Sequence, residues 1–174
     1  SSPNLGLFKS DKINPDKIDV VFNGAKDSFH QTKSNKIIEL TKNREYFFYI
    51  GSLHPRKNIT NLVKGFNRFK QNNVNEVKLV IGGDFLFQSK DIKSILNELE
   101  YKDEIILTGR LSDEDLNTWL SGAIALTYIP FFEGFGIPLL EAMKCKTPIL
   151  TSDVTSLPEV GSDAAIYVNP ESIN

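Results

Sequence analysis

Two glutamates separated by eight positions, Glu133 and Glu141, have the types and spacing to do chemistry on a ligand. On one continuous helix their carboxylates would lie about two turns apart, roughly 12 Å along the axis, and would share no task. Gly134 and Gly136 argue against that geometry and predict a loop that turns into a helix. Glu133 is then expected at the mouth of a site and Glu141 in the first helical turns. One carboxylate could face a reacting group while the other accepts hydrogen bonds from hydroxyl groups.

The start of this helix is a candidate anion site. Pro138 suits the first helical position, where a missing N–H costs nothing, and the glycines allow positive φ and close approach of a ligand. The unpaired amides of Gly134, Phe135, Gly136 and Ile137 would then point outward, and such a helix start attracts phosphate. A diphosphate at the amides, with sugar hydroxyls on either side, fits a sugar nucleotide. The alternative is that the acid serves the helix dipole and the glycines serve only a turn.

A second candidate anion site is the loop 52–58, which carries Arg56 and Lys57. The loop follows an aromatic, β-forming run and precedes a helical pattern. Ligands of open α/β sheets lie at the carboxyl ends of the strands, which favours this loop as part of a site. The alternative is a solvated basic loop.

The acidic run Asp113, Glu114 and Asp115 contains an Asp-x-Asp pattern that can bind metal ions. Acidic residues are also what the dipole favours in the first turn of a helix, and Ser112 or Asp113 suits the N-cap position. We interpret the run as a helix start, and no metal site is predicted.

Strand and helix patterns alternate along the chain, which is typical of a parallel sheet with helices on both faces. The predicted fold class is α/β and Rossmann-like. A Gly-x-Gly-x-x-Gly fingerprint is missing after the first strand, which argues against a nicotinamide dehydrogenase. Residues 1–44 are interpreted as an interdomain arm and linker, and residues 45–174 as the Rossmann-like domain. The predicted strands are 46–50, 77–81, 104–107, 123–129, 147–150 and 165–168. Helices are predicted at 35–40, 59–70 and 91–99. Two further helices are predicted to start at 112 or 113 and at 138, and a turn or short helix is predicted at 156–159.

The composition argues against several classes of protein. A chain of 174 residues with 40% hydrophobic content can bury one sizeable core but not those of two full domains. The formal net charge of −2 argues against a nucleic-acid-binding protein. The single cysteine, Cys145, fits a reducing cytoplasm. With no signal peptide and no apolar run of about 20 residues, a cytoplasmic location is expected, with membrane contact only through parts outside this sequence.

The stretch EGFGIPLLEAM at 133–143 resembles the E-x7-E motif of retaining glycosyltransferases of the GT-B architecture, of the group 1 or family 4 type, which includes bacterial mannosyltransferases. Three further segments resemble that family in the same order: YIGSLHPRKN at 49–58, LTGR at 107–110 and TSDVTSLPE at 151–159. A lone pair of glutamates is weak evidence, whereas four ordered segments are specific. The resemblance implies the C-terminal, nucleotide-sugar-binding domain of such an enzyme.

The resemblance also implies roles for the two glutamates and the basic loop. Glu133 is expected at the donor sugar as the catalytic group, and Glu141 at the ribose hydroxyls. Lys57, supported by Arg56, is expected to bind the diphosphate together with the amides of 134–137. The electrostatic task of these groups would be to stabilise the leaving group as it gathers negative charge.

The remaining donor-binding positions implied by the resemblance are Gly51, Ser52, Arg110 and Leu111. Many relatives carry an arginine directly after the strand glycine, where this chain has Ser52. Either Arg56 substitutes for that arginine, or Lys57 and the helix start carry more of the phosphate binding. The backbone around Arg110 and Leu111 is expected to contact the nucleotide base.

The expected substrate is a nucleotide diphosphate sugar, with GDP-mannose as the specific guess, and the expected acceptor is a glycan or lipid-linked glycan. GT-B enzymes generally need no metal, so no cofactor is expected. The acceptor-binding N-terminal domain is absent from this sequence, and residues 1–174 alone are expected to bind nucleotide without transferring sugar. Two alternatives stay open: a regulatory module that senses nucleotide sugars without catalysis, and a structural α/β interaction domain.

Overall fold

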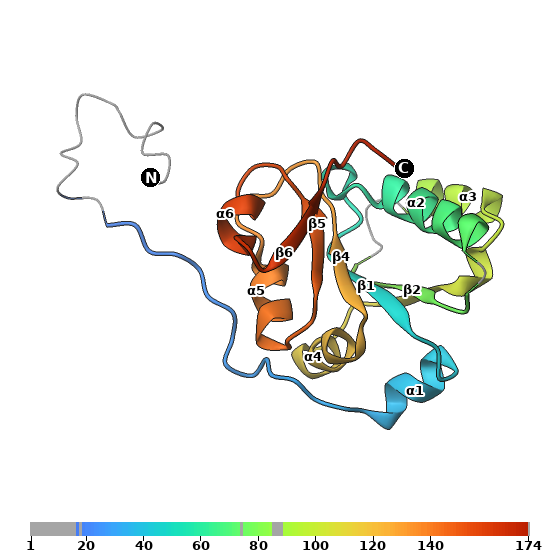
Figure 1. Ribbon diagram of the computed structural model, residues 1–174, viewed down its shortest axis with the longest axis horizontal. Coiled ribbons are helices and arrows are strands. Elements are labelled where there is room, and N and C mark those ends of the chain that lie inside the picture. Colours follow the sequence, from blue (N-terminus) through green and yellow to red (C-terminus); the bar gives the residue numbers. More distant parts are fainter. Residues whose placement is uncertain (1–16, 18, 74, 85–88, 174) are drawn as a thin grey trace.

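The computed structural model describes residue 17 and residues 19–73, 75–84 and 89–173. Helices and strands alternate in the order expected for a Rossmann-like domain (Figure 1). The strands are β1 (Tyr46–Ile50), β2 (Lys78–Gly82), β3 (Ile105–Gly109), β4 (Ala125–Tyr128), β5 (Ile149–Ser152) and β6 (Ala165–Val168). The helices are α1 (Asn35–Thr41), α2 (Ile59–Asn72), α3 (Ser89–Glu98), α4 (Asp113–Gly122), α5 (Ile137–Lys144) and α6 (Leu157–Gly161), with short 3₁₀ turns at Pro55–Lys57 and Lys102–Glu104.

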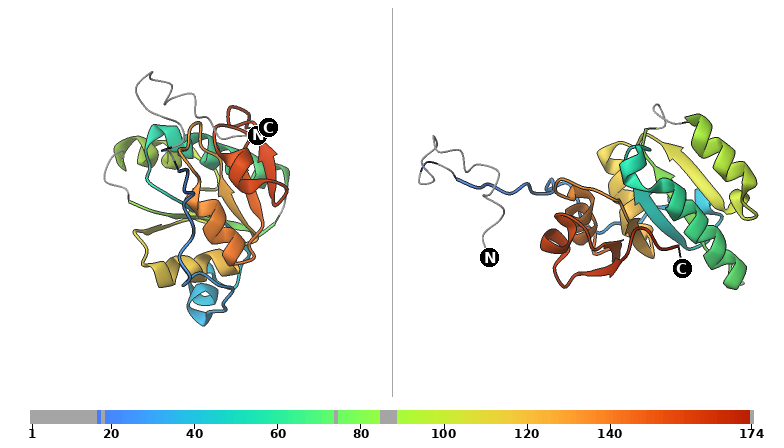
Figure 2. Two further views of the ribbon diagram at one scale, coloured as in Figure 1. Left: turned by 90° about the vertical axis from the view of Figure 1, so that its left-hand side faces the viewer. Right: turned by 90° about the horizontal axis from the view of Figure 1, so that it is seen from above.

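The six strands form one sheet in the order β3-β2-β1-β4-β5-β6, and every pair of neighbours is parallel. The order therefore reverses between β1 and β4, which are hydrogen-bonded neighbours although β2 and β3 lie between them in the sequence. Figures 1 and 2 show α2 and α3 on one side of the sheet and α4, α5 and α6 on the other. This confirms the predicted α/β class with helices on both faces. In such sheets, ligands bind outside the carboxyl ends of the strands at the point of reversal.

The aromatic run of β1 explains how the two helical layers attach to the sheet. Successive side chains of a strand point to opposite faces. Phe47 meets Phe69 of α2 edge to face, with ring centroids 5.7 Å apart. Phe48 stacks on Trp119 of α4 at 6.2 Å and is fully buried. One strand thus contributes aromatic anchors to both halves of the core.

Strand and helix boundaries agree with the sequence patterns to within about two residues, as expected of hydrophobic periodicity. β1 and β6 match their predicted bounds, whereas β5 starts two residues later than predicted. α5 begins at Ile137, so Pro138 occupies the second helical position and not the first. The correction is small because the second amide of a helix also lacks an intrahelical partner.

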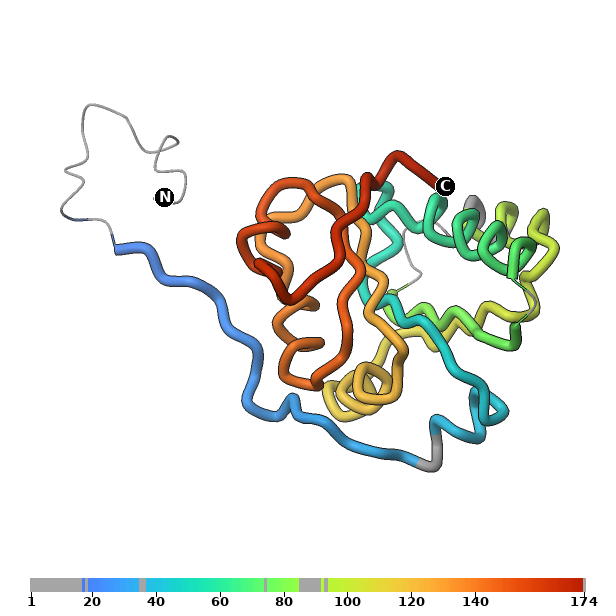
Figure 3. Tube along the Cα trace, in the orientation of Figure 1, coloured from blue at the N-terminus to red at the C-terminus, as the bar shows by residue number. Residues whose placement is uncertain are grey.

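Part of the segment interpreted as linker packs on the domain (Figure 3). The His30 amide donates to Asn117 Oδ1 at 2.8 Å, and the Thr32 amide donates to Ser121 Oγ at 3.1 Å, which ties residues 30–32 to α4. Phe29 is buried in the core, with 3% of its surface exposed. Residues 29–32 therefore pack against the sheet domain, and the boundary at 44/45 stays a prediction. Among the described residues, no helix is both long enough and apolar enough to cross a bilayer.

Candidate functional site

The loops that follow β1 and β4 are bonded to each other at the point where the strand order reverses. The Phe131 amide donates to the Arg56 carbonyl at 2.8 Å, and Arg56 Nη1 donates to the Phe132 carbonyl at 3.3 Å. Asn58 Nδ2 donates to the Ile129 carbonyl at 3.0 Å. Asn58 has a φ of 60°, a left-handed conformation that asparagine tolerates better than most residues. These bonds fix the basic loop against the segment that carries Glu133.

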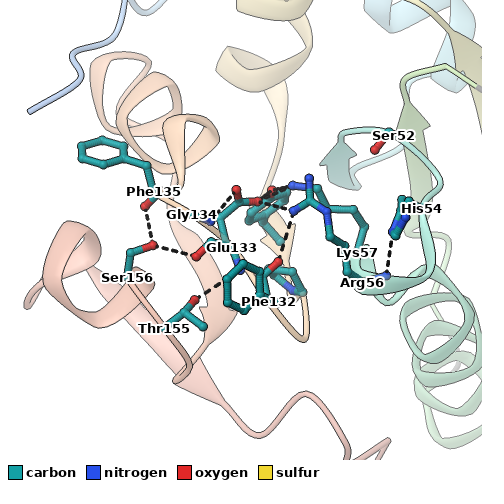
Figure 4. A network of polar contacts seen from close by, with 12 residues as sticks. Ser52, His54, Arg56, Lys57, Phe132, Glu133, Gly134, Phe135, Thr155 and Ser156 are labelled. Carbon is teal, nitrogen blue, oxygen red and sulfur yellow. Dashed lines mark hydrogen bonds and ion pairs between the residues drawn. The ribbon is translucent and has the colours of Figure 1, made fainter. Parts of the chain in front are cut away.

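A polar cluster of two buried residues, Lys57 and Tyr128, and the half-buried Glu133 lies between these loops. Lys57 Nζ forms an ion pair with Glu133 Oε2 and donates to the Tyr128 hydroxyl, which also bonds to Glu133 Oε2. Arg56 Nη1 lies 3.8 Å from the same carboxylate oxygen, at the exposed edge of the cluster. Figure 4 shows Glu133, Lys57 and Arg56 pointing toward one another. The structure thus brings together three of the predicted site residues.

Burial and pairing act in opposite directions on the charges of this cluster. Burial raises the pKa of the Glu133 carboxyl, but hydrogen bonds from Lys57 and Tyr128 and the charge of Lys57 outweigh it, so the net pKa lies below its usual value. Burial lowers the pKa of Lys57, and Glu133 opposes that change. Burial and the neighbouring carboxylate raise the pKa of Tyr128, so its hydroxyl keeps its proton at neutral pH. Glu133 is therefore held as a carboxylate.

The backbone around Glu133 is held from behind by the segment before α6. The Glu133 amide donates to Thr155 Oγ1 at 3.2 Å. Ser156 Oγ donates to the carbonyls of Glu133 at 3.2 Å and Phe135 at 3.0 Å (Figure 4). Thr155 has a φ of 54°, which is rare for a β-branched residue. The position of Glu133 thus depends on contacts from the segment before α6 as well as from the loop after β1.

The two glycines of the turn have different reasons to be glycine. Gly136 has a φ of 102°, and a Cβ there would lie 2.7 Å from Leu157 Cδ2. Gly134 does not have positive φ, and nothing lies within 4 Å of where its Cβ would be. The expected positive φ is therefore right for Gly136 and wrong for Gly134. Gly136 is required by its conformation and by the packing of Leu157.

The turn leaves backbone donors free at the start of α5. Within the described part of the chain, the amides of Phe135, Gly136 and Ile137 have no acceptor. The Gly134 amide donates to Glu133 Oε1 at 3.0 Å. The ring of Phe135 points away from the cluster and lies 6.4 Å from the ring of Phe22 (Figure 4). Three of the four predicted anion-binding amides are therefore available.

Glu141 lies one helical turn further along α5, in different surroundings. Burial raises the pKa of its carboxyl to about 7, Asp113 adds to that rise, and Lys26 opposes it. Lys26 Nζ also pairs with Asp113 Oδ2 at 2.6 Å. Among the described residues, Glu141 forms no hydrogen bond or ion pair with the Lys57, Tyr128 and Glu133 cluster. The two glutamates thus face different groups, as the glycine turn predicts.

The remaining predicted donor-binding residues lie in loops at the carboxyl ends of β1 and β3. The Gly51 amide donates to the Gly82 carbonyl at 3.1 Å, and the Ser52 carbonyl accepts from Tyr49 Oη at 3.2 Å. A Cβ on Gly83, whose φ is 136°, would lie 1.8 Å from the Gly51 carbonyl oxygen, so the two loops are in backbone contact.

Arg110, directly after β3, is exposed, while Leu111 is half-buried. A Cβ on Gly82 would lie 3.0 Å from Leu111 Cδ1, which places Leu111 over the end of β2. These two residues therefore share the carboxyl edge of the sheet with the cluster, and the structure shows no contact between them and Glu133.

The acidic run after Arg110 has the structural role inferred from the sequence. Asp113, Glu114 and Asp115 form the first turn of α4, and Ser112 Oγ accepts from the Asp115 amide at 3.1 Å as the N-cap. Among the described residues, no group of three or more potential metal ligands is found.

Two residues of the site were missed by sequence reasoning. Tyr128 ends an apolar strand and reads as a core residue, yet its hydroxyl contacts both charges of the cluster. Thr155 reads as part of a turn. The signal available for Tyr128 was a polar hydroxyl at the carboxyl end of a buried strand, only five positions before Glu133.

The family model for glycosyl transferases group 1 matches residues 30–173, which is most of the chain. The chain belongs to this family. The match covers the basic loop, the glycine turn and both glutamates, so the resemblance inferred from four segments extends over the whole sheet.

Curated relatives in this family include mannosyltransferases. The O-antigen chain mannosyltransferase B of Escherichia coli is 33% identical over 129 residues, covering 74% of this chain and 34% of that protein. The O-antigen chain mannosyltransferase RfbU of Salmonella typhimurium is 30% identical over 166 residues, covering 95% of this chain and 44% of that protein. The chain thus spans less than half the length of these relatives.

Solved structures with the same fold include glycosyltransferases. The Anabaena protein HepE in complex with UDP-glucose aligns with a TM-score of 0.77 and 18% identity over 89% of this chain and 44% of that one. The apo form of the lipopolysaccharide outer core galactosyltransferase WaaB aligns with a TM-score of 0.67 and 24% identity over 93% of this chain and 45% of that one. At these identities the likeness concerns the fold, which is that of GT-B glycosyltransferases.

Proposed function

We propose that this chain is the donor-binding domain of a retaining glycosyltransferase that transfers a hexose from a nucleotide diphosphate sugar to a glycan or lipid-linked acceptor. The observation that carries the proposal is the Lys57, Tyr128 and Glu133 cluster. It places a buried ammonium and an ionised carboxylate beside the free amides of α5 at the reversal of strand order. A cation and amides suit a diphosphate, and a fixed carboxylate suits a sugar.

The proposed chemistry is electrostatic stabilisation of a departing nucleoside diphosphate. As the glycosidic bond loosens, negative charge gathers on the diphosphate, and Lys57 with the free amides of 135–137 lowers the energy of that state. Glu133 orients the sugar and stabilises the positive charge that develops on it. The arrangement is not that of a glycosidase acid/base pair, because Glu141 faces Asp113 and Lys26, and among the described residues no second carboxylate is set to activate water.

Glu133 pairs with the same ammonium group, that of Lys57, that a phosphate would need. Lys57 is 8% exposed, and its charge is balanced by the carboxylate. A diphosphate would therefore compete with Glu133 for Lys57, which frees the carboxylate for the sugar. Glu141 accepts the ribose hydroxyls, and the backbone of Arg110 and Leu111 contacts the base. Arg56, at the rim, takes the role of the arginine missing at Ser52.

The similarity to O-antigen mannosyltransferases favours GDP-mannose as the donor, while HepE, of the same fold, was crystallised with UDP-glucose. We propose that a further domain of a longer chain binds the acceptor, since the curated relatives are more than twice as long as the matched region. The reaction is proposed to need no resident metal and to take place in the cytoplasm, at the inner face of a membrane where the acceptor is lipid-linked.

Calorimetric titration with GDP and UDP tests the donor site. Lys57→Ala and Glu141→Ala should each weaken binding of the preferred nucleotide about 10- to 100-fold, since a charge-assisted hydrogen bond contributes roughly 1.5–3 kcal/mol. Lys64→Ala, which removes an exposed lysine from α2, is the matched control and should bind as the unmodified chain does. Equal affinity in all four proteins would overturn the assignment.

A further inference from the structure

Tyr128 lies at the end of β4 and is held there by the sheet. Its side chain is 1% exposed and stacks on Tyr49, with ring centroids 6.0 Å apart. Its carbonyl accepts a hydrogen bond from Thr151 Oγ1 of β5 at 2.6 Å. The phenol ring therefore has little freedom to move, in contrast to the long side chains of Lys57 and Glu133.

The chemistry of the three side chains assigns the hydrogen bonds of the cluster. An ammonium has only donors, an ionised carboxylate has only acceptors, and a phenol has one donor and acceptor lone pairs. The Tyr128 hydroxyl contacts both Lys57 Nζ and Glu133 Oε2. It must accept from Lys57 and donate its own proton to Glu133. Its raised pKa keeps that proton in place.

The proposal concerns the state in which a diphosphate has taken Lys57 from Glu133. In that state the carboxylate would lose its ion pair and keep two fixed donors, the Tyr128 phenol on Oε2 and the Gly134 amide on Oε1. Of these two, only the phenol is a side-chain group that substitution can remove. We propose that Tyr128 is a positioning residue, which holds Glu133 ionised and aimed at the sugar through a hydrogen bond that does not depend on Lys57. Its place in the reaction rests on the proposed function, whereas its hold on the Glu133 carboxylate does not.

Titration of Glu133 tests the inference without any turnover. The charged and titratable groups facing this carboxylate are Lys57 and Arg56 from the loop after β1, Tyr128 from β4 and, less directly, Tyr49 from β1. Tyr128→Phe removes one donor and leaves the ring and the ion pair. A hydrogen bond to the ionised form lowers the pKa of a carboxyl, so its loss should raise the titration midpoint of Glu133 by about one pH unit. NMR of the Glu133 carboxyl carbon in residues 1–174 measures this midpoint.

The matched control is Tyr46→Phe. Tyr46 is also a buried strand tyrosine, but it lies at the amino end of β1, whereas the cluster lies at the carboxyl ends of the strands. Its hydroxyl donates to the Trp119 carbonyl at 2.8 Å. Its loss should lower stability without moving the Glu133 midpoint. An unchanged midpoint in Tyr128→Phe, or an equal shift in both variants, would overturn the inference. If Tyr128→Phe does not fold, the ring Cζ resonance of Tyr128 in the unmodified chain decides, since it must follow the titration of Glu133.

The consequence for turnover is tested in the full-length transferase. There Tyr128→Phe should lower kcat at least 10-fold with a smaller change in KM for the donor, and should shift the acidic limb of the pH–rate profile upward. Nucleotide affinity should change little, because Lys57 and the α5 amides are intact. If the unmodified chain binds no nucleotide but Tyr128→Phe raises the Glu133 titration midpoint as expected, the proposed function is overturned and the hydrogen bond from Tyr128 to Glu133 is supported. The reverse result would overturn the positioning role alone.

Discussion

Glu141 is a half-buried acid on α5 whose ionisation is opposed by its surroundings. Burial and Asp113 raise its pKa to about 7, against an ordinary value of 4.5 for a glutamate, so the folded state favours the protonated acid. Its favourable contribution to stability is fully present below pH 4.5 and is lost as the pH rises through 7. Glu141 therefore destabilises the fold when it is ionised. An acid with such a raised pKa, on the helix that follows the glycine turn, fits a binding role.

We therefore expect Glu141→Gln to stabilise the fold at pH 8 and to change it little at pH 4. After allowance for solvent screening, the free energy of unfolding should rise by about 1 kcal/mol at pH 8, which corresponds to about 2–4 °C in the melting temperature. Thermal unfolding followed by circular dichroism between pH 4 and pH 8 measures it. A gain of the same size at both pH values would show that ionisation of Glu141 is not its cause. Nucleotide affinity of the unmodified chain should decline as the pH falls below 7, because the ribose hydroxyls need the ionised acceptor.

At the scale of single residues, the sequence indicated chemistry but not contacts. Glu133, Lys57 and Arg56 were all identified as site residues from type and position. Their meeting could not be derived locally, because Lys57 and Glu133 are 76 positions apart and become neighbours only when β1 and β4 pair. The hydroxyl of Tyr128 was overlooked because a tyrosine in an apolar strand packs equally well with its polar end unused.

The turn into α5 is the element on which the site depends most. Gly136 combines left-handed φ with contact to Leu157, so that two separate effects exclude a side chain. Gly134, two positions earlier, has open space and ordinary φ. The pair therefore separates the effect of conformation from that of merely adding a methyl group.

Gly136→Ala should lower the free energy of unfolding by about 2–3 kcal/mol, from left-handed backbone strain and displacement of Leu157. Gly134→Ala, the matched control, should change it by less than about 0.5 kcal/mol. Urea unfolding of both variants measures the difference. Similar losses in the two would mean that the conformation of the turn is not what Gly136 provides.

Elements were the most predictable level, because period and capping are local signals. Ser112 caps α4, and the acids that follow it fill the first turn, as the sequence indicated. The packing of residues 26–32 on the domain has no counterpart in the sequence patterns, and it includes hydrogen bonds from Lys144 of α5 to the Lys26 carbonyl and Asp27 Oδ1. That stretch is charged and weakly periodic, and its anchors are the buried Phe29 and the amides of His30 and Thr32, which leave no pattern in the sequence.

At the scale of the molecule, the parallel sheet and its helical layers follow from the alternation of strand and helix patterns, and the family match covers residues 30–173. The reversal of strand order at β1 and β4 is what brings the basic loop and the glycine turn to one edge. No sequence pattern sets that order by itself. It depends on which strands the crossover connections bring together, and that is set by the packing of the whole sheet.

Residues 1–174 should bind a nucleoside diphosphate and transfer no sugar. A ligand that binds only the native state raises the free energy of unfolding by mass action, by roughly 2.7 kcal/mol at a ligand concentration of 100 times Kd. The melting temperature rises with it. A thermal-shift screen of GDP, UDP and ADP, with the corresponding nucleosides as controls, identifies the base. No shift with any of them would favour a purely structural domain. Sugar transfer by this chain alone would contradict the need for a second domain.

The bonds between the loops after β1 and β4 join the two halves of the sheet at their carboxyl edge. Lys57 and Glu133 are therefore carried on a single stiff scaffold, and their separation cannot be adjusted by flexing within this domain. Under the proposed arrangement with a second domain, opening and closing around a substrate would take place at a hinge outside this domain. The entropy lost on capturing a donor should accordingly be small here and concentrated in the side chains of Lys57 and Arg56.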